Sequence, residues 1–459
     1  MPQFRHIKKA QRVARETREI QRQSAQPPPL LGAGRNLWQR IGNAQHGSGY
    51  HFFLLYCLLL IALAFIVDHP VAIGRGCVEI ILSPSHLITD YVAVGGLGAT
   101  LLNSGMVTFV SLILLFVRRV QISGPIISAL FTLSGFAFFG KNVLNSVPIL
   151  LGSLVYAKIS RIPFSQISIV SLFATALSPL VSMLWLGVGL PLQVGVPLGI
   201  FIGLLVGFIS PPLASSFLLF HRGYNLYNVG FTAGIIGMVF TALLRMFDVE
   251  LQPVLLLSTD QALPLGLFIS GLSLFLIGVG LWRSPGAWQK YPDILTQSGR
   301  LVTDFTKIVS VETTFINMGL MGLLGCGYVV LLGGPINGPV IGAILTVIGF
   351  AAFGVQPKNA VPVMVGVALA AITNQAPYND TTAILAALFG TTLAPLAGHY
   401  GSFVGIIAGF THMAIVLNVG YLHGGINLYN NGFSGGFVAA FMVPLLEDFN
   451  VRKQKRKKR

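Results

Sequence analysis

The chain contains the same stretch of sequence twice. Residues 123–157 and 337–371 align without a gap at an offset of 214 residues, and each copy begins with Gly-Pro and continues with Asn-x-Val-Pro. A second matched pair follows: residues 221–231 and 423–433 share the pattern H-x-G-x-N-L-Y-N-x-G-F. Two matched pairs in the same order are typical of an internal duplication. We therefore expect two related structural units.

The composition predicts that these units lie in a membrane. Of the 459 residues, 54% are hydrophobic and only 9% are charged, and the mean hydropathy is +0.76. Such a chain cannot cover a water-soluble globule with charged side chains. The net charge of +15 is concentrated at the ends, since residues 1–50 carry nine Lys or Arg and residues 447–459 carry seven. Basic tails beside membrane spans indicate retention in the cytoplasm, so we expect no nucleic-acid partner.

Fourteen apolar runs approach the roughly 17–25 residues needed to cross the hydrocarbon core. They lie at 52–67, 96–117, 123–140, 147–159, 168–187, 195–212, 228–246, 263–282, 316–333, 338–355, 361–373, 383–397, 402–420 and 432–446. Several are short and rich in Gly and Pro, which is typical of half-helices and re-entrant segments. The predicted fold is an all-α integral membrane protein of about 14 transmembrane segments, some of them short or broken helices.

The positions of Lys and Arg predict the orientation in the membrane. With the N-terminus in the cytoplasm, alternation of the spans places most basic loops on the same side as both tails. Arg245 and Lys141 are exceptions, and we expect the Lys141 ammonium to reach the membrane surface from the end of a span. The predicted location is the inner (cell) membrane, with many passes and both termini cytoplasmic.

The same alternation predicts that the two repeats have inverted topology, because an odd number of spans separates their starts. Inverted repeats are common in transporters, where two conformations open one site to either side of the membrane in turn. We divide the chain as follows: basic tail 1–50, first span and interfacial segment 51–95, repeat unit 1 at 96–246, linker span and cytoplasmic loop 247–313, repeat unit 2 at 314–446, and basic tail 447–459.

Polar residues that recur at membrane depth form the predicted binding site. Hydrocarbon disfavours amides and phenols unless they face a cavity or a neighbouring helix. The predicted solute-binding residues are Asn225, Tyr227, Asn228, Asn427, Tyr429, Asn430, Asn103 and Asn317. Capping of a helix N-terminus is the alternative for the asparagines of the repeated segment. For Asn103 and Asn317 the alternative is a bridge between helices.

Three titratable residues are candidates for coupling transport to a proton or an ion. His221 and His423 precede the two repeated segments, and an imidazole can relay a proton near neutral pH. Bonding to a loop carbonyl is the alternative for both. Asp380 is either an intramembrane coupling carboxylate or the N-cap of the next span.

Motifs of several other protein classes are missing from the sequence. It contains no Walker motif, no HExxH and no GxSxG, and Cys57, Cys77 and Cys326 have no paired spacing. We therefore expect no catalytic residues, no metal, no cofactor and no ATP-driven transport within this chain. A site of amides, phenols and imidazoles with little acid favours a neutral polar or anionic solute over a divalent cation.

The two H-x-G-x-N-L-Y-N-x-G-F segments, with the Gly-Pro repeat before each, carry a resemblance to a known family. On these residues the chain resembles a bacterial family of multi-pass membrane proteins catalogued as a domain of unknown function. The resemblance covers most of residues 50–446 and implies an integral membrane protein, but no substrate. Urea-channel-type proteins also use inverted halves with Tyr-Asn-Gly segments, which is an analogy at the level of the fold.

The predicted function is a secondary transporter or facilitative channel for a small polar solute, with its site between the inverted repeats. The expected partners are that solute, the lipid bilayer and further copies of the chain in a homo-oligomer. A membrane-embedded enzyme acting on a lipid-linked substrate, with His221 or His423 as base, is one alternative. A scaffold that recruits partners through its basic tails is another.

Overall fold

The computed structural model describes residues 44–84, 88–249, 255–373 and 377–457. The regular elements of this part of the chain are helices, and each of the fourteen apolar runs lies in a helix or a broken helix. Ten are long and apolar enough to cross a membrane, and four are shorter helices. The chain is therefore an all-α, multi-pass membrane protein. Residues 1–43 of the predicted basic tail lie outside the described residues.

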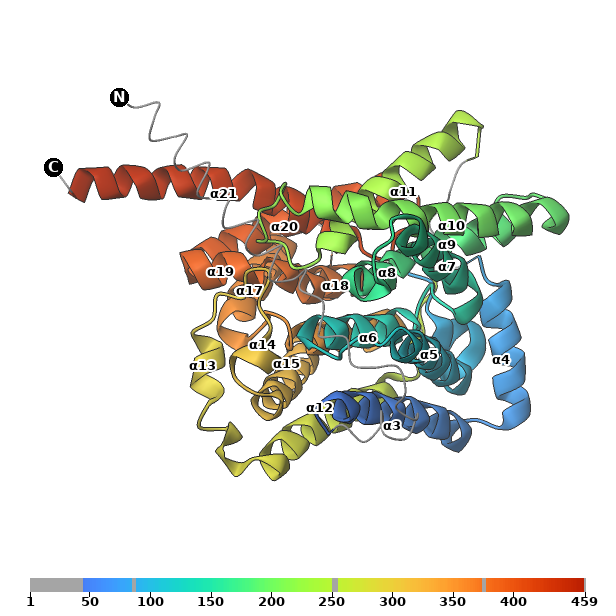
Figure 1. The fold of residues 1–459 in the computed structure, drawn as a ribbon, viewed down its shortest axis with the longest axis horizontal. Helices are drawn as coiled ribbons and strands as arrows, with labels where there is room; N and C mark the ends of the chain where they lie inside the picture. Colours follow the sequence, from blue (N-terminus) through green and yellow to red (C-terminus); the bar gives the residue numbers. More distant parts are fainter. Residues whose placement is uncertain (1–43, 85–87, 250–254, 374–376, 458–459) are drawn as a thin grey trace. The chain divides into compact units, whose positions relative to one another are not determined.

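The shorter apolar helices come in two consecutive pairs along the chain, and a long segment precedes and three long segments follow each pair (Figure 1). The ten long segments are α3 (Ala44–Val67), α5 (Tyr91–Val117), the broken helix α8–η2–α9–η3 (Ser168–Ala174, Thr175–Leu177, Ser178–Ser182, Met183–Gly187), α10 (Leu192–Phe217), α11 (Asn228–Met246), α12 (Ala262–Arg283), α15 (Val311–Leu331), the broken helix α18–η5–α19 (Thr381–Gly390, Thr391–Leu393, Ala394–Tyr400), α20 (Ser402–His423) and α21 (Asn430–Lys457). The four shorter apolar helices are α6 (Gly124–Phe136), α7 (Val143–Ile159), α16 (Gly338–Phe350) and α17 (Pro357–Thr373). The remaining elements are α4 (Pro70–Leu82), η1 (Phe164–Gln166), η4 (Pro285–Ala287), α13 (Tyr291–Leu295) and α14 (Phe305–Ile308).

Helices from the two halves of the chain begin and end at matched positions. α6 and α16 both have 13 residues, α7 and α17 both have 17, and the bounds of each pair differ by the same 214 residues as the sequence repeat. α5 is broken at Gly96, where φ is 82°. The matching position in the second half is Ser310, which separates α14 from α15 and caps α15. The duplication seen in sequence is thus also a duplication of helix boundaries.

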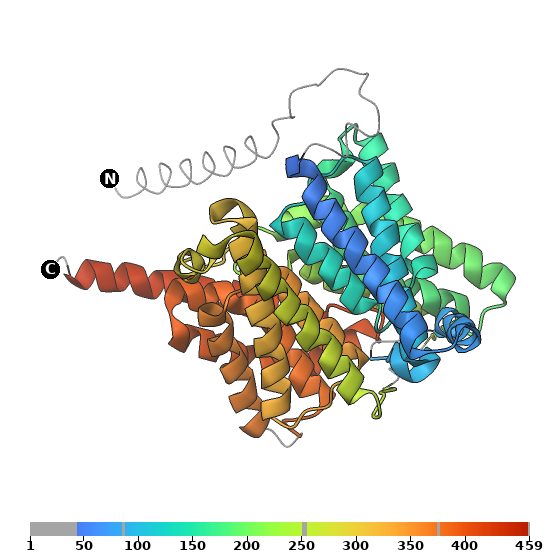
Figure 2. The same ribbon diagram turned by 90° about the horizontal axis from the view of Figure 1, so that it is seen from below.

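The two halves meet along α6 and α16. In Figure 2 the blue-to-green part and the yellow-to-red part of the described chain lie side by side. Every residue of α6 and α16 is buried. The helices run antiparallel, because Gly124 at the start of α6 lies against Ala352, just after α16, and Gly338 lies against Phe138. Their backbones touch: a Cβ on Gly135 would lie 2.4 Å from a carbonyl oxygen of α16.

Two carboxylates at matched positions connect the halves. Asp90 accepts a hydrogen bond from the Gly338 N–H at the start of α16 (3.1 Å), and Asp304 accepts one from the Gly124 N–H at the start of α6 (3.2 Å). Each carboxylate thus lies at the positive end of a helix dipole that belongs to the other half. The positions differ by 214 residues, but the unit boundaries drawn at 96 and 314 exclude both, and the pair was missed from sequence.

Candidate functional site

The two Asn-Leu-Tyr-Asn segments lie where the halves cross, at the starts of α11 and α21. The Leu226 N–H donates to the Thr392 carbonyl (3.0 Å), and the Leu428 N–H donates to the Ala176 carbonyl (3.1 Å). Each segment therefore pairs with the helix break of the other half. The α11 and α21 backbones also approach closely, since a Cβ on Gly230 would lie 3.2 Å from the Cα of Gly432.

Proline explains why the two partner helices are broken. Pro179 and Pro395 are the second residues after the turns η2 and η5, at positions where a continuous helix would require an N–H donor. Without that donor the preceding turn tightens, and backbone carbonyls near the break become available to a partner. The sequence therefore provides two acceptor sites inside otherwise apolar segments. Breaks of this kind are common where membrane proteins bind a solute.

An aromatic cluster surrounds the crossing point, and its six members are all buried. The Tyr227 and Tyr429 rings lie 4.9 Å apart between centroids. Tyr227 packs on Phe350 (4.5 Å), and Tyr429 packs in the matched way on Phe136 (4.7 Å). The remaining two members are Phe173 and Phe389. The cluster thus follows the duplication and places the two predicted tyrosines at its centre.

The matched asparagines Asn225 and Asn427 differ in their hydrogen bonding. Asn225 donates to the Gly432 carbonyl (2.9 Å) and accepts from the Thr392 hydroxyl, so both ends of its amide are used. Asn427 accepts from the Tyr429 N–H (3.0 Å), but its Nδ2 is buried without a partner. Two contacts of Asn225 thus have no counterpart at Asn427: Asn225 Nδ2 binds a carbonyl whereas Asn427 Nδ2 finds none, and the position that matches Thr392 in the first half is Ala176, which has no hydroxyl to donate to Asn427 Oδ1.

Buried polar atoms without a hydrogen-bond partner are concentrated in the repeated segments. Among the described residues nine such atoms occur, and six belong to the two segments: His221 Nδ1, Tyr227 OH, His423 Nδ1, Asn427 Nδ2, Tyr429 OH and Asn430 Oδ1. Thr391 lies near the Tyr227 hydroxyl and Thr132 near that of Tyr429, without good hydrogen-bond geometry. Native proteins satisfy most buried polar groups, so this concentration marks a candidate functional site.

The histidines of the repeated segments bind groups nearby. His221 Nε2–H donates to Asn228 Oδ1 (2.9 Å), and Asn228 in turn donates to a carbonyl of α10 (3.0 Å). His423 Nε2–H donates to the Gly234 carbonyl in the other half (3.1 Å). Desolvation lowers the pKa of His221 to about 4. His221 is therefore neutral near pH 7, where the predicted relay would need it to titrate.

Three other predicted residues have structural partners. Asn103 donates to two carbonyls of the loop after α6, both at 2.8 Å, and Asn317 donates to the matching loop after α16 at 2.7 and 2.9 Å. These are the helix-bridging contacts given above as the alternative. Asp380 is the N-cap of α18 and accepts from the Ala383 N–H at 2.7 Å, which is the capping alternative.

Comparison with known proteins places this chain in a family. The family model described as "Protein of unknown function (DUF1576)" matches residues 69–246 and 284–448. The chain belongs to this family. The two matched segments contain the carboxylates Asp90 and Asp304, both helix breaks and both Asn-Leu-Tyr-Asn segments, and they leave out α12. No curated protein and no solved structure matches the chain, so the analogy with urea-channel-type proteins gains no structural support.

The prediction that Lys141 reaches the membrane surface is wrong. In this DUF1576 protein the side chain is 0% exposed, and its ammonium donates to the Thr175 hydroxyl at the helix break η2. Lys141 lies in the loop between α6 and α7, which folds inward because Asn103 holds its backbone. A signal was present in the sequence: the aligned position in the second copy is Val355, as expected for a buried site rather than for a span end.

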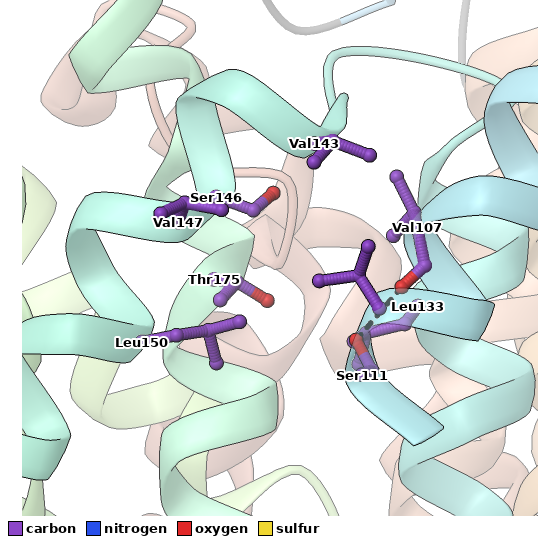
Figure 3. A pocket seen from close by; sticks show the side chains of 9 residues that line it. Val107, Ser111, Leu133, Val143, Ser146, Val147, Leu150 and Thr175 are labelled. Carbon is purple, nitrogen blue, oxygen red and sulfur yellow. Dashed lines mark hydrogen bonds between the residues drawn. The ribbon is translucent and has the colours of Figure 1, made fainter. Parts of the chain in front are cut away.

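A small cavity lies beside Thr175. It has a volume of about 10 Å³, room for roughly one water molecule. Ser111, Ser146 and Thr175 supply hydroxyls to its wall, and the rest of the lining is aliphatic (Figure 3). The described residues contain no group of three or more His, Cys, Asp or Glu that could hold a metal ion.

Proposed function

We propose that this protein is a secondary transporter or facilitative channel for a small polar solute, and that the solute binds where the two Asn-Leu-Tyr-Asn segments cross. The observation that carries the proposal is the concentration of unpartnered buried polar atoms at that crossing. Unsatisfied polar groups in an apolar interior are costly. They are retained at sites where a solute supplies the missing partners in part of the functional cycle.

The surrounding architecture supports a site that can change conformation. Each segment binds a helix break in the other half through one backbone hydrogen bond, at Leu226 and at Leu428. Because these bonds join the halves, movement of one half against the other would open or close the crossing. The antiparallel contact of α6 and α16 is the geometry expected of repeats that are inverted in the membrane.

The first test measures solute flux. Purified protein is reconstituted into proteoliposomes, and stopped-flow light scattering follows their swelling in iso-osmotic urea, glycerol, acetamide or sodium acetate. We expect faster swelling than in protein-free liposomes for at least one solute. Tyr227→Phe and Tyr429→Phe, which remove only the unpartnered hydroxyls, should slow it about tenfold or more, the effect of one lost hydrogen bond in a buried site.

Tyr156→Phe is the matched control, because Tyr156 packs against Phe208 away from the crossing. It should leave flux unchanged. Equal flux in all three variants would exclude the tyrosine hydroxyls from the path, and no flux for any of the solutes would contradict transport. Deletion of residues 1–43 separates transport from the scaffold alternative, because a transporter should keep its flux without this basic segment.

The second test measures topology. Single cysteines replace Arg119 and Gly334, which lie in matched loops before α6 and α16, in a chain whose three natural cysteines are changed to Ala. A membrane-impermeant maleimide is then added from one side. Inverted repeats require the two positions to react from opposite sides. Reaction of both from the same side would contradict the inversion.

A further inference from the structure

The buried Lys141 has a place in the fold that packing alone does not explain. We propose that Lys141 is the counter-charge for an anionic solute, so that the site takes a small anion of about the size of a carboxylate. This inference names the solute class of the function proposed above and rests on it.

Lys141 has no acidic partner. Within the described part of the chain the ion pairs are Arg222–Glu447, Arg283–Glu312 and Lys307–Asp304, and none includes Lys141. Its one side-chain partner is the Thr175 hydroxyl, which itself donates to the Leu172 carbonyl. An ammonium has three donors, so two remain for another acceptor. An unpaired charge in a membrane interior is strongly disfavoured, and an anion would supply the missing charge.

Lys141 is close to the crossing of the halves. Its neighbour Gly140 packs against the side chain of Leu428, with no space for a Cβ between them. Its partner Thr175 directly precedes Ala176, which accepts the backbone hydrogen bond of Leu428. The residue before Lys141 and the residue after its partner Thr175 therefore both contact Leu428 of the second Asn-Leu-Tyr-Asn segment. This places the lysine beside the segment to which the solute is proposed to bind.

Two of the four unpartnered groups on the repeated segment 423–433 can donate hydrogen bonds, and the other two, His423 Nδ1 and Asn430 Oδ1, are acceptors. Asn427 Nδ2 can only donate, and the Tyr429 hydroxyl can donate its proton. Together with the two unused donors of Lys141, these two donors can bind the oxygens of a carboxylate or another small oxyanion. The anion assignment rests on the charge of Lys141, and the two donors are compatible with it.

The duplication supports a special role for this position. Asn103 and Asn317 hold the two matched loops in the same way, yet the loops carry Lys141 in one half and Val355 in the other. The fold therefore forms this loop without a lysine. Lys141 adds a charge that the architecture itself does not require.

The test compares anions with a neutral molecule of similar shape. Thermal unfolding of the protein in lipid nanodiscs is measured against increasing sodium acetate, sodium phosphate, sodium chloride and acetamide. We expect at least one anion to raise the Tm saturably. Lys141→Met should weaken its apparent affinity by about 10- to 100-fold, the effect of one lost charge-assisted hydrogen bond. Acetamide should act equally on both proteins.

Three variants make the result specific. Lys358→Met is the matched control, because Lys358 is exposed at the start of α17, and it should bind anions as the wild type does. Lys141→Arg should keep part of the anion effect. Without anion, Lys141→Met should unfold at the same or a higher temperature, because an apolar side chain replaces a buried ammonium. If Lys141→Met does not fold, Thr175→Val, which removes the lysine's partner, takes its place.

Each outcome supports or overturns the assignment. Saturable stabilisation that needs Lys141 supports it. The absence of saturable stabilisation by all three anions, or equal anion affinity in Lys141→Met, overturns it. The swelling assay separates this result from the transport proposal. If urea or glycerol flux persists while anion binding does not depend on Lys141, transport stands and the anion assignment fails. If the wild type passes no solute but binds anions through Lys141, the transport proposal fails instead.

Discussion

The loop after α6 and the loop after α16 have the same anchoring but different chemistry. Asn103 binds the Lys141 carbonyl at 2.8 Å, and Asn317 binds the Val355 carbonyl at 2.9 Å. Both side chains at the anchored position are buried, one a lysine and one aliphatic. The comparison teaches that the duplicated residues maintain the architecture, while the residue present in only one copy brings an amine that the architecture does not require.

The two helix breaks differ in the same sense. The Thr392 hydroxyl donates to Asn225 Oδ1, whereas Ala176 has no hydroxyl for Asn427. In addition, Asn225 Nδ2 binds the Gly432 carbonyl while Asn427 Nδ2 has no partner. The unsatisfied Asn427 precedes Leu428, which packs on Gly140, the neighbour of the buried Lys141. The Asn225 amide is therefore fully used, whereas the Asn427 amide keeps a donor available to a solute. The predictions below test this asymmetry.

The largest expected effect comes from placing a lysine in the second loop. Val355→Lys would bury an ammonium where the protein has an aliphatic side chain, and overpacking would add to the cost. We expect a loss of about 3–5 kcal/mol in the free energy of unfolding, the usual cost of an uncompensated buried charge. Unfolding by SDS in mixed micelles measures it. An unchanged free energy of unfolding would mean that both loops accept a lysine. The difference between Lys141 and Val355 would then have no chemical basis.

Removal of the loop anchors should affect the two halves equally. Asn103→Ala and Asn317→Ala each leave two buried loop carbonyls without a donor, which should lower the free energy of unfolding by about 2–3 kcal/mol. The same SDS titration compares them. If one substitution lowers the free energy of unfolding much less than the other, the two asparagines do not anchor their loops equally. That result would contradict the shared anchoring of the two loops.

The crossed carboxylates provide a smaller test of the symmetric part. Asp90→Asn and Asp304→Asn keep an acceptor at each helix start but remove the charge that interacts with the helix dipole. We expect each to cost about 1–2 kcal/mol. This loss of stability should become smaller as the salt concentration is raised, because salt screens the solvent-exposed part of the interaction between carboxylate and helix dipole. Unequal losses would show that the two caps have separate roles.

The smallest effect concerns the helix breaks. Thr392→Ala removes the hydroxyl that binds Asn225 and should cost about 1 kcal/mol. The reverse change, Ala176→Thr, places a hydroxyl where it can donate to Asn427 Oδ1, as Thr392 does to Asn225. It should leave stability equal or slightly higher and slow solute flux, because it holds the Asn427 amide in place. Swelling rates and unfolding free energies are measured on the same preparations. Faster flux in Ala176→Thr would contradict a role for the Asn427 amide in the path.

Much of the fold could be predicted from the sequence because the signals are local. Long apolar runs predict membrane helices, and all fourteen runs lie in helices or broken helices. The fixed offset between the two copies also predicted which helices would match. Proline at 179 and 395 marks the breaks, since it removes a backbone donor wherever it stands.

The chemistry of the candidate site was less accessible, because it depends on contacts between distant residues. Asn225 and Asn427 lie in the same Asn-Leu-Tyr-Asn sequence, yet only Asn225 has partners for both ends of its amide, and those partners, the Gly432 carbonyl and the Thr392 hydroxyl, lie in the opposite half. Lys141 follows the apolar run 123–140, and a lysine at the end of a span is normally expected at the membrane surface. Its burial follows from an inward loop that local hydropathy does not show.

The sequence by itself determined a membrane-embedded helical chain with a duplicated set of helices, because hydrophobic length and repetition act over neighbouring residues. Only the tertiary structure decided which polar groups find partners. In the folded chain the two copies cross, so that each of the carboxylates Asp90 and Asp304 and each Asn-Leu-Tyr-Asn segment binds the opposite half. Hydrogen bonding and desolvation depend on these through-space neighbours, and this is why the partners of the buried lysine emerge only from the folded arrangement.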